Sequence, residues 1–576
     1  MNNYEIAKIL HEIAIFEEMK GEKFKPRAYE KAALYIGSLS DDLATIYRKG
    51  GTGSLMELPG IGKSIAEKLS ELIRTGKLQY YAHLKREIPV DVSALASIEG
   101  IGAKTMKVLY EELGITNIEQ LEAAAKGHRI RDLPGFGEKS EKQILHGIEF
   151  FKKSHGGRFI LGFILEILED ICNRLRKQDS VKKVELAGSA RRMKESIGDA
   201  DFLAVSNQPE QVMDFFITMP EVEYIHTKGI TKSMVRLHSG IDCDLRIVPE
   251  ESFGAAFQYF TGNKQHNVVV RTIALHKGYK LNEYGLYDKR NNQLAGRLEE
   301  DIYSKLGLAW IPPELREDKG EIEAAKECRL PKLINYNSLK GDVQVHTNWT
   351  DGNNSIIEMG QAAKAIGLEY IAITDHSQTL GIAHGLNKEK LEKQKKEIES
   401  TNHKMKDDEG ITILRGVEVN ILKDGSLDLE NKILKEFDVV GAAIHSYFSL
   451  PRKEQTKRLT SAMSNPNVDI LFHPTGRIIQ QRQSIDVDIE KILQVSKETN
   501  TILEIDASPD RLDLRDEYIK LAIENGCKLT IDSDAHDKSH FFHFVKLGIS
   551  QARRGWAEQN DVINTLSLEK FLKSLK

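Results

Sequence analysis

The chain has 576 residues, several times the usual domain length, so we expect three or more domains, each able to bury a core. A formal net charge of −5 with 29% charged residues excludes a polybasic protein that holds nucleic acid through bulk charge. The four cysteines, Cys172, Cys243, Cys328 and Cys527, lie far apart, which argues against a disulfide framework or a thiolate zinc site and fits a reducing cytoplasm.

The amino-terminal segment, MNNYEIAKILHEIAIFEEMKGEKF, predicts an amphipathic helix. Acidic residues occur throughout it, so it lacks the basic start and the continuous apolar core of a signal peptide. No apolar run in the sequence reaches membrane-spanning length. We therefore expect no membrane association.

A short pattern then recurs three times, as LPGIGKSIAEKL from Leu58, IEGIGAKTMKVL from Ile98 and LPGFGEKSEKQIL from Leu133. Each copy has an apolar residue, a turn, Gly-x-Gly and a helical pattern, so backbone N–H groups would be bare where the helix begins. Such amides bind phosphate without reading bases. A single copy is more often only a turn between helices, but three copies favour DNA binding. The glycines concerned are Gly60, Gly62, Gly100, Gly102, Gly135 and Gly137.

Two aspartates follow a glycine in the run AGSARRMKESIGDADFLAV, residues 187–205. Because side chains alternate along a strand, Asp199 and Asp201 project from one face, roughly 6 to 7 Å apart at the backbone. Asp242 and Asp244 repeat this spacing in GIDCDLRIVPEESFG. Three acids from two neighbouring strands can hold two divalent ions for in-line phosphoryl transfer. Asp-x-Asp alone would more often be an exposed strand.

Phosphate-binding groups precede the first aspartate pair. Gly188 and Ser189 offer backbone N–H and hydroxyl donors, and Arg191 and Arg192 offer guanidinium groups suited to a polyphosphate. A solvated basic patch is the alternative, which the neighbouring acids and the three repeats disfavour. The segment therefore predicts a nucleotide site beside a metal site.

Polar residues and prolines predict a linker near 316–338. Beyond it, apolar runs repeatedly end in metal-binding residues, and helical stretches separate most of these runs. The pattern predicts a β/α barrel whose ligands gather at the carboxyl ends of the strands. Imidazoles and carboxylates suit a hydrolytic centre of two or three Zn²⁺, Mn²⁺ or Fe²⁺ ions.

Residues 1 to about 315 resemble the family X DNA polymerases. The segment GSARRMKESIGDAD is similar to their nucleotidyltransferase signature, IDCDLRIVP to the strand with their third aspartate, and QYFTGNKQHNVVVRTIALHKGYKLNEYGLY to their nucleotide-selection segment. The resemblance implies that Asp199 and Asp201 ligate both metals, Mg²⁺ or Mn²⁺. It implies that Asp244, rather than Asp242, ligates the catalytic ion and helps to deprotonate the primer 3′ hydroxyl.

The same resemblance implies roles for residues around these acids. The incoming nucleotide would contact Gly188, Ser189, Arg192, Gly198, Tyr259, Phe260 and Asn267, and Arg271 would approach the template strand. Core packing of the aromatic pair is an alternative compatible with this role.

The amino-terminal helices resemble the small domain with which family X polymerases hold the 5′ phosphate at a gap. Lys25, Tyr29 and Lys68 match functional positions there, and Lys68 matches the lysine that forms a Schiff base with an abasic sugar. Ser64 and Met56 stand where lysines are expected. An ordinary solvated helix lysine is the alternative for Lys68.

The carboxy-terminal half resembles the PHP domain, and the order polymerase then PHP resembles the bacterial family X polymerases over the whole chain. The resemblance implies two or three Mn²⁺ or Zn²⁺ ions and a 3′–5′ exonuclease on DNA. Many PHP domains open with His-x-His, whereas this chain has Gln344, whose amide binds Zn²⁺ more weakly. The implied ligands are Gln344, His346, Asp351, His376, Glu418, His445, His473, Asp534 and His536.

We expect a multidomain fold: an all-α helix-hairpin-helix region, an α+β nucleotidyltransferase palm with a small nucleotide-selection subdomain of thumb or fingers type, and a distorted β/α barrel. The expected boundaries are 1–85 and 86–155 for two helical parts, 156–250 for the palm, 251–315 for nucleotide selection, 316–338 for the linker and 339–576 for the PHP domain.

The leading hypothesis is a template-directed, gap-filling DNA repair polymerase with a 3′–5′ exonuclease and a weak abasic-site lyase. Its partners would be gapped or primer–template DNA and deoxynucleoside triphosphates. We expect a cytoplasmic monomer, with no protein partner indicated. Template-independent nucleotidyl transfer, a DNA-end scaffold with decayed catalysis, and hydrolysis of small phosphate esters by the PHP half are the alternatives.

Overall fold

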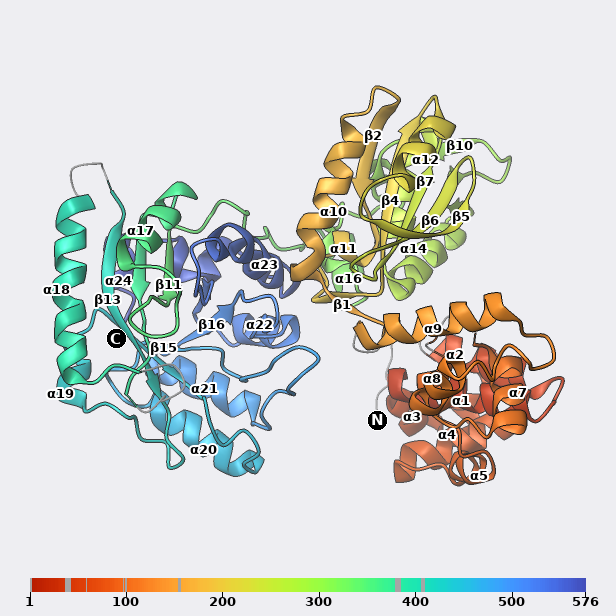
Figure 1. Ribbon diagram of the computed structural model, residues 1–576, viewed down its shortest axis with the longest axis horizontal. Coiled ribbons are helices and arrows are strands. Elements are labelled where there is room, and N and C mark those ends of the chain that lie inside the picture. The colour runs from red at the N-terminus through yellow and green to blue at the C-terminus, as the bar shows by residue number, and fades with distance from the viewer. Residues whose placement is uncertain are drawn as a thin grey trace.

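The computed structural model describes residues 3–36, 43–58, 60–96, 98, 101–153, 157–378, 385–405 and 410–576. The predicted site residue Gly100 lies outside these ranges. Figure 1 shows three bodies along the chain: red and orange helices at the amino terminus, a yellow and green α/β body, and a larger blue-green α/β body at the carboxy terminus. Within the described residues, no helix is both long and apolar enough to cross a bilayer.

The amino-terminal body is all helical, as predicted. In α4, Ile65, Leu69 and Leu72 recur on one helix face and are buried in the common core. Gly76 ends this helix in the left-handed conformation, with φ 67°. The helices are α1 (Asn3–Met19), α2 (Lys25–Ile36), α3 (Leu43–Met56), α4 (Lys63–Thr75), α5 (Gln79–Glu87), α6 (Val92–Ala96), α7 (Ala103–Leu113), α8 (Ile118–Lys126) and α9 (Glu138–Lys153).

The palm, residues 157–248, is built on a five-stranded sheet of order β2-β4-β7-β6-β5. Its strands are β2 (Val181–Leu186), β4 (Asp199–Ser206), β5 (Val222–Lys228), β6 (Lys232–Leu237) and β7 (Asp242–Ile247). Only the central pair, β4 and β7, is parallel; the other neighbours are antiparallel. Helices α10 (Leu161–Arg176) and α12 (Pro209–Ile217) pack on the sheet, and a short pair, β1 (Phe159–Ile160) and β3 (Ser196–Ile197), lies beside it.

The selection subdomain, residues 253–315, follows the palm. It contains α13 (Phe253–Thr261), α14 (Lys264–His276), the antiparallel strands β8 (Lys280–Asn282), β9 (Gly285–Tyr287) and β10 (Gln293–Ala295), and α15 (Glu299–Lys305). Val270, Ala274 and Tyr303 lie in its core. This small core lets the subdomain pack as a unit against the palm.

The segment 316–338, which we predicted to be a polar linker, is folded instead. Arg316 is fully buried and bonds Glu299 at 2.6 and 3.2 Å, and α16 (Glu321–Lys326) follows. Glu321 accepts from His266 at 2.7 Å inside the same core. The polar composition was misleading because these charges are paired and buried rather than solvated.

The barrel, residues 341–576, has seven parallel strands in sequential order: β11 (Gly341–Val345), β12 (Tyr370–Ile373), β13 (Thr412–Asn420), β14 (Val439–Ala443), β15 (Ile470–Leu471), β16 (Ile502–Asp506) and β17 (Leu529–Asp532). A parallel bridge between Val345 and Ala535 joins the first strand to the end of the last. The outer helices are α17 (Ile356–Ala365), α18 (Lys388–Met405), α19 (Asn431–Leu434), α20 (Arg452–Met463), α21 (Ile489–Thr499), α22 (Asp516–Glu524), α23 (His540–Arg554) and α24 (Leu568–Leu572). The predicted β/α barrel is confirmed.

Candidate active sites

The three glycine hairpins share one turn. Ile61 donates to Leu58 at 3.1 Å, Ile101 to Ile98 at 3.1 Å, and Phe136 to Leu133 at 3.0 Å, each from backbone to backbone. Gly60 and Gly135 have φ of 79° and 83°, which a residue with a Cβ rarely adopts.

The second glycine of each hairpin begins a helix. Gly62 and Gly102 are the N-caps of α4 and α7, and Gly137 directly precedes α9. No described atom lies within 4 Å of a Cβ built on Gly62, Gly102 or Gly137. The space beside these glycines is therefore open, and the first N–H groups of the helices that follow have no acceptor within the helix, an arrangement suited to phosphate binding.

The three predicted 5′-phosphate residues lie around Tyr80. Lys25 is exposed and pairs with Glu17 at 3.3 Å, and the Tyr80 hydroxyl donates to the same carboxylate. The Tyr29 ring stacks on Tyr80, with 6.4 Å between centroids, and Lys68 Nζ lies 4.7 Å from the Tyr80 centroid. Tyr29 is only 4% exposed, so its ring contributes packing rather than a free surface.

The palm aspartates face one another across the parallel strand pair. Asp199 is in register with Asp242, and Asp201 with Asp244. Burial first, and then the charges of Asp199 and Asp244, raise the pKa of Asp201 to about 7. Crowded carboxylates of this kind favour divalent cations, so the donor set fits two ions.

Asp242 and Asp244 have different partners. Asp242 accepts from Arg236 at 2.8 and 2.9 Å and from His226 at 2.9 Å. Burial would raise the pKa of Asp242, but His226 and Arg236 hold it below its usual value. By contrast, Asp244 Oδ1 is buried and has no hydrogen-bond partner in the described part of the chain. The other oxygen, Asp244 Oδ2, pairs with Lys232 at 3.1 Å and with Arg246 at 3.3 Å, so Oδ1 is the oxygen of this carboxylate that is open to a further ligand.

A cavity of about 500 Å³ opens beside these acids; its lining includes Ser189, Arg192, Gly198, Asp199 and Asp244. Gly188 has φ 64°, and a Cβ there would lie 2.5 Å from Asp201 Oδ2, so glycine is required for this close approach.

The two arginines that follow Ser189 are already paired. Arg191 forms a bidentate pair with Glu299, both bonds 2.8 Å, and Arg192 donates to Glu317 at 2.6 Å. Arg191 therefore ties the palm to the selection subdomain, whereas Arg192 also lines the cavity.

The selection residues lie on α13 and α14. Tyr259 and Phe260 are half-buried and meet edge to face at 5.2 Å. The Asn267 amide donates to Tyr259 and Gly262 carbonyls at 2.7 and 3.0 Å, so contact with a base requires exchange of these bonds. Arg271 is exposed on the same helix.

The barrel ligands converge at the strand ends. Two sets of ligand atoms, each within 4.8 Å of one another, are His346, Asp351, His376 and His536, and His376, Glu418 and His445. His473 adds a contact of 2.9 Å to Glu418, and Asp534 lies 3.2 Å from His346. Apart from Gln344, every predicted barrel ligand belongs to this one constellation.

Buried imidazole and carboxylate atoms crowd together here. His376 Nδ1 lies 3.0 Å from Glu418 Oε2 and His346 Nε2 lies 3.2 Å from Asp534, while His473 Nδ1 is buried with no hydrogen-bond partner among the described residues. Burial would lower the pKa of His376, but Glu418 and Asp351 raise it to about 10. This excess of negative charge suits added cations.

Gln344 is fully buried on β11. With its nitrogen toward Glu504, its amide donates to both carboxylate oxygens, at 2.6 and 3.1 Å. The predicted ligand role of Gln344 stays a prediction, since this carboxylate competes for the side chain.

Two functional candidates were missed in the sequence. Arg511 Nε lies 3.7 Å from Asp534 and 3.6 Å from Asp506, and Asn420 Oδ1 lies 2.7 Å from His445 Nδ1, which orients that imidazole. Arg511 follows the apolar run ILEID, and Asn420 ends the apolar run GVEVN. This position after a predicted strand was the available signal in the sequence.

Comparison with known families matches four segments. Residues 1–78 match a helix-hairpin-helix domain, 92–149 a SAM-like helix-hairpin-helix tandem, 256–317 the DNA polymerase beta thumb and 342–508 the PHP domain.

Several proteins are similar in sequence. The DNA polymerase/3′-5′ exonuclease PolX of Bacillus subtilis is 37% identical, with 100% of both chains covered. A probable phosphatase of Thermoanaerobacter is 34% identical over 32% of this chain and 73% of its own length. DNA polymerase lambda of Arabidopsis thaliana is 24% identical over 54% of this chain and 62% of its own length.

Proposed function

Because the chain belongs to the family X DNA polymerases that carry a PHP domain, we propose that its palm fills short gaps during DNA repair and its barrel trims 3′ ends. The chain is a DNA-directed DNA polymerase with 3′–5′ exonuclease activity. Two groups of barrel side chains could hold metal ions, and we propose that the palm centre is metal-dependent as well. We place it in the bacterial cytoplasm as a monomer acting on gapped DNA and deoxynucleoside triphosphates.

The pairing of β4 with β7 carries the palm's part of the proposal. Asp199 and Asp201 hold two Mg²⁺ or Mn²⁺ ions, and Asp244 holds the catalytic one. Bound ions supply the positive charge that polarises the attacking hydroxyl and neutralises the phosphates. Asp244 Oδ1, which has no hydrogen-bond partner among the described residues, accepts the proton of the primer 3′ hydroxyl.

The cavity residues bind and orient the nucleotide. The amides that begin with Gly188, the Ser189 hydroxyl, the Gly198 backbone and the Arg192 guanidinium hold the triphosphate. Tyr259 and Phe260 lie against the sugar. Asn267 contacts the base edge, and Arg271 contacts the template strand.

The hairpin glycines hold the DNA backbone on either side of the gap. Their amides face open space and carry no base-specific group, so the grip is independent of sequence. Lys25 and Lys68, on either side of Tyr80, bind the 5′ phosphate.

The barrel hydrolyses the terminal phosphodiester. His346, Asp351, His376, Glu418, His445, His473, Asp534 and His536 hold two or three Mn²⁺ or Zn²⁺ ions, with Gln344 at the edge of the set. When bound, the ions would supply positive charge that acidifies the attacking water and offsets the charge of the phosphate. Arg511, beside Asp534, adds positive charge for the phosphate.

Primer extension on gapped DNA with Mg²⁺ or Mn²⁺, with and without nucleotides, tests both activities. Extension must follow the template base; incorporation that ignores it on homopolymer templates would instead support template-independent transfer. Loss of extension in Asp244→Ala is required, and its persistence would refute the palm assignment.

The barrel is tested with a labelled primer and Mn²⁺. Digestion should disappear in the double variant His346→Ala, Asp534→Ala, and unchanged digestion would refute the assignment. Similarity to probable phosphatases favours hydrolysis of small phosphate esters as a second candidate. Faster turnover of p-nitrophenyl phosphate than of the primer would support it.

We also propose weak lyase activity at Lys68, which Ser64 Oγ holds at 2.9 Å. Borohydride trapping on abasic DNA should fall in Lys68→Ala, and equal trapping would end this proposal.

A further inference from the structure

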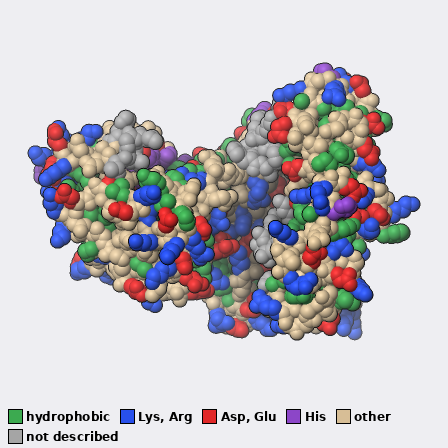
Figure 2. Space-filling model, turned by 90° about the horizontal axis from the view of Figure 1, so that it is seen from below, with side chains coloured by type: hydrophobic (Ala, Val, Ile, Leu, Met, Phe, Trp, Pro, Cys, Tyr) green, Lys and Arg blue, Asp and Glu red, His purple; other side chains and the backbone are tan. Residues whose placement is uncertain are grey.

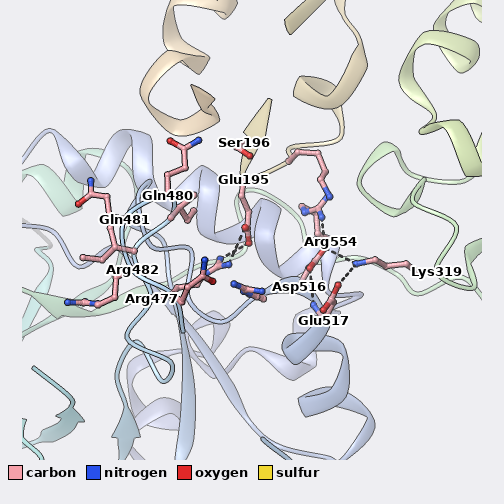
Figure 3. A pocket seen from close by; sticks show the side chains of 15 residues that line it. Glu195, Ser196, Lys319, Arg477, Gln480, Gln481, Arg482, Asp516, Glu517 and Arg554 are labelled. Atoms are coloured by element: carbon pink, nitrogen blue, oxygen red, sulfur yellow. Dashed lines mark hydrogen bonds and ion pairs between the residues drawn. The ribbon is translucent and has the colours of Figure 1, made fainter. Parts of the chain in front are cut away.

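A second cavity, of about 450 Å³, lies where the palm meets the barrel. The palm supplies Lys194, Glu195 and Ser196, and the loop after β15 supplies residues 477–483. Figure 3 shows Gln480, Gln481 and Arg482 on one side and Lys319, Glu517 and Arg554 on the other. Figure 2 shows Lys and Arg side chains in the hollow between the two halves of the molecule.

Positive charge exceeds negative charge in this cleft. Its cations are Lys194, Lys319, Arg477, Arg482, Arg515 and Arg554, and its carboxylates are Glu195, Asp516 and Glu517. Four of these cations are paired: Arg477 with Glu195 at 2.5 Å, Lys319 with Glu517 at 3.2 Å, Lys194 with Glu317 at 3.4 Å, and Arg554 with Asp516. The excess favours an anion.

Three guanidinium groups in the cleft have an unused donor. The Nε atoms of Arg477, Arg515 and Arg554 are buried and lack hydrogen-bond partners in the chain segments that the structure describes. The side chains of Arg477 and Arg554 are only 4% and 2% exposed. Buried donors without partners are rare, and phosphate oxygens are well suited to satisfy them.

The cleft adjoins both active sites. Lys194 also lines the palm cavity that contains Asp199 and Asp244. On the other side, the backbone N–H of Ile479 in the cleft loop donates to the Asp510 carbonyl at 2.6 Å, and Nε of the next residue, Arg511, lies 3.7 Å from Asp534. Basic side chains thus run from the palm acids to the barrel ligands.

We propose that this cleft binds the phosphodiester backbone of a single-stranded DNA 3′ end and guides it between the two active sites. The inference rests on the proposed function. A strand is favoured over a free nucleotide because the cations extend toward both sites rather than surround one pocket. Gln480, Gln481 and Gln483, at the cleft surface, offer amides to sugars or bases without sequence preference.

The test adds negative charge at exposed positions that leave the fold intact. The cleft variant is Gln481→Glu with Gln483→Glu, two exposed residues of its lining. The matched control is Gln211→Glu with Gln361→Glu, exposed on α12 and α17 and outside the cleft lining. Arg515→Ala removes one of the unpaired donors as a third variant.

Two measurements are made on the full chain. Binding of DNA with a frayed, mismatched 3′ end is titrated against salt. A heparin trap then gives the fraction of mismatched ends that are trimmed and extended without dissociation. The cleft variant and Arg515→Ala should lower frayed-end affinity by about threefold to tenfold and the salt slope by about 0.7 per lost phosphate contact. The trapped fraction should fall while the control matches wild type.

Equal frayed-end affinity and equal trapped fraction in cleft and control variants would overturn the inference. So would loss of pyrophosphate or nucleotide binding in the cleft variant with strand binding unchanged, because the cleft would then hold a small anion. Extension of a matched primer and digestion of a free single strand are measured in parallel. If the wild-type protein lacks both extension and digestion, the proposed function fails. If both activities are present but the trapped fraction does not depend on the cleft, only this inference fails.

Discussion

At the scale of single residues, Asp242 and Asp244 lie on the same strand but have different expected roles. We expect Asp242 to stabilise the fold and Asp244 to act in catalysis. Asp244→Asn should reduce primer extension by on the order of 10³-fold, because the carboxylate that we propose as a ligand of the catalytic ion is lost. Asp242→Asn should retain extension but lose about 2 kcal/mol of folding free energy, because Arg236, 3% exposed, loses its buried partner. Extension rates and urea unfolding of the two variants check this; equal loss of activity in both would contradict it.

Asp201 should make the metal-free protein sensitive to pH. Its pKa is about 7 when folded, against an ordinary value of 3.8, so the folded state binds the proton more tightly than the unfolded state. Between pH 4 and pH 7 this group therefore lowers stability as pH rises, and bound divalent ions offset the loss. The gain in melting temperature on adding Mg²⁺ should grow from pH 5 to pH 7.5.

The variant Asp201→Asn is the control for this pH effect. It lacks the titrating carboxylate, so its Mg²⁺-dependent gain should be smaller and flatter with pH. An identical pH profile in the variant and in wild type would remove Asp201 as the source.

The sequence predicts most single residues of the candidate sites because motif and chemistry coincide in them, and their roles stay predictions. Asn267 and Gln344 show the limit of this reasoning. The side-chain amide of each already donates to groups of the protein. Asn267 donates to the carbonyls of Tyr259 and Gly262, and Gln344 donates to Glu504. Those partners are distant in sequence or carry no motif, so spacing alone could not reveal them.

At the scale of elements, the two glycines of a hairpin allow the effect of backbone strain to be measured apart from the effect of DNA contact. Gly62→Ala should leave the stability of the protein unchanged, because φ of Gly62 is −82° and no described atom lies near the new Cβ. The same substitution should weaken DNA binding several-fold, because the methyl group would hinder a phosphate from reaching the amides of α4. Gly60→Ala should cost about 1 kcal/mol of stability as well, because φ is 79°. Thermal melting and fluorescence anisotropy with gapped DNA measure the two effects.

Gly76→Ala is the control for these variants, because it ends α4 with φ 67° away from any hairpin turn. It should lose stability and keep DNA affinity. Unchanged DNA affinity in Gly62→Ala would show that the amides at α4 do not contact phosphate.

Elements were predicted well where periodicity was strong, as in the hairpin helices and the barrel strands. The segment 316–338 was misassigned because its charges suggested solvent exposure. Arg316, Glu299, His266 and Glu321 compensate one another inside the protein, which only the tertiary structure shows.

At the scale of the whole molecule, the palm and barrel share a packed interface. Glu195, four residues before Asp199, bonds Arg477, four residues after His473, and Gln551 donates to the same carboxylate at 2.8 Å. Leu512 and Leu547 of the barrel half lie in the palm's core cluster. These contacts join segments hundreds of residues apart and follow no motif, so the placement of the halves was not predictable.

Glu195→Ala should weaken this interface by about 3 kcal/mol, because Arg477 stays buried without its carboxylate. We expect faster proteolysis between the halves and an earlier melting transition, with extension on a matched primer retained. Glu185→Ala, at an exposed palm position with a 3.5 Å contact to Arg176, is the control. Identical proteolysis of both variants would contradict the role of Glu195.

The joining of the first barrel strand to the end of the last has a consequence for biosynthesis. His346 meets Asp534 and His536 only after nearly two hundred further residues have left the ribosome, whereas the palm aspartates are complete by residue 244. A nascent chain would therefore acquire its synthetic centre long before its degradative one. A chain that stopped before Asp534 would keep all three palm aspartates but lack two of the proposed barrel ligands, Asp534 and His536.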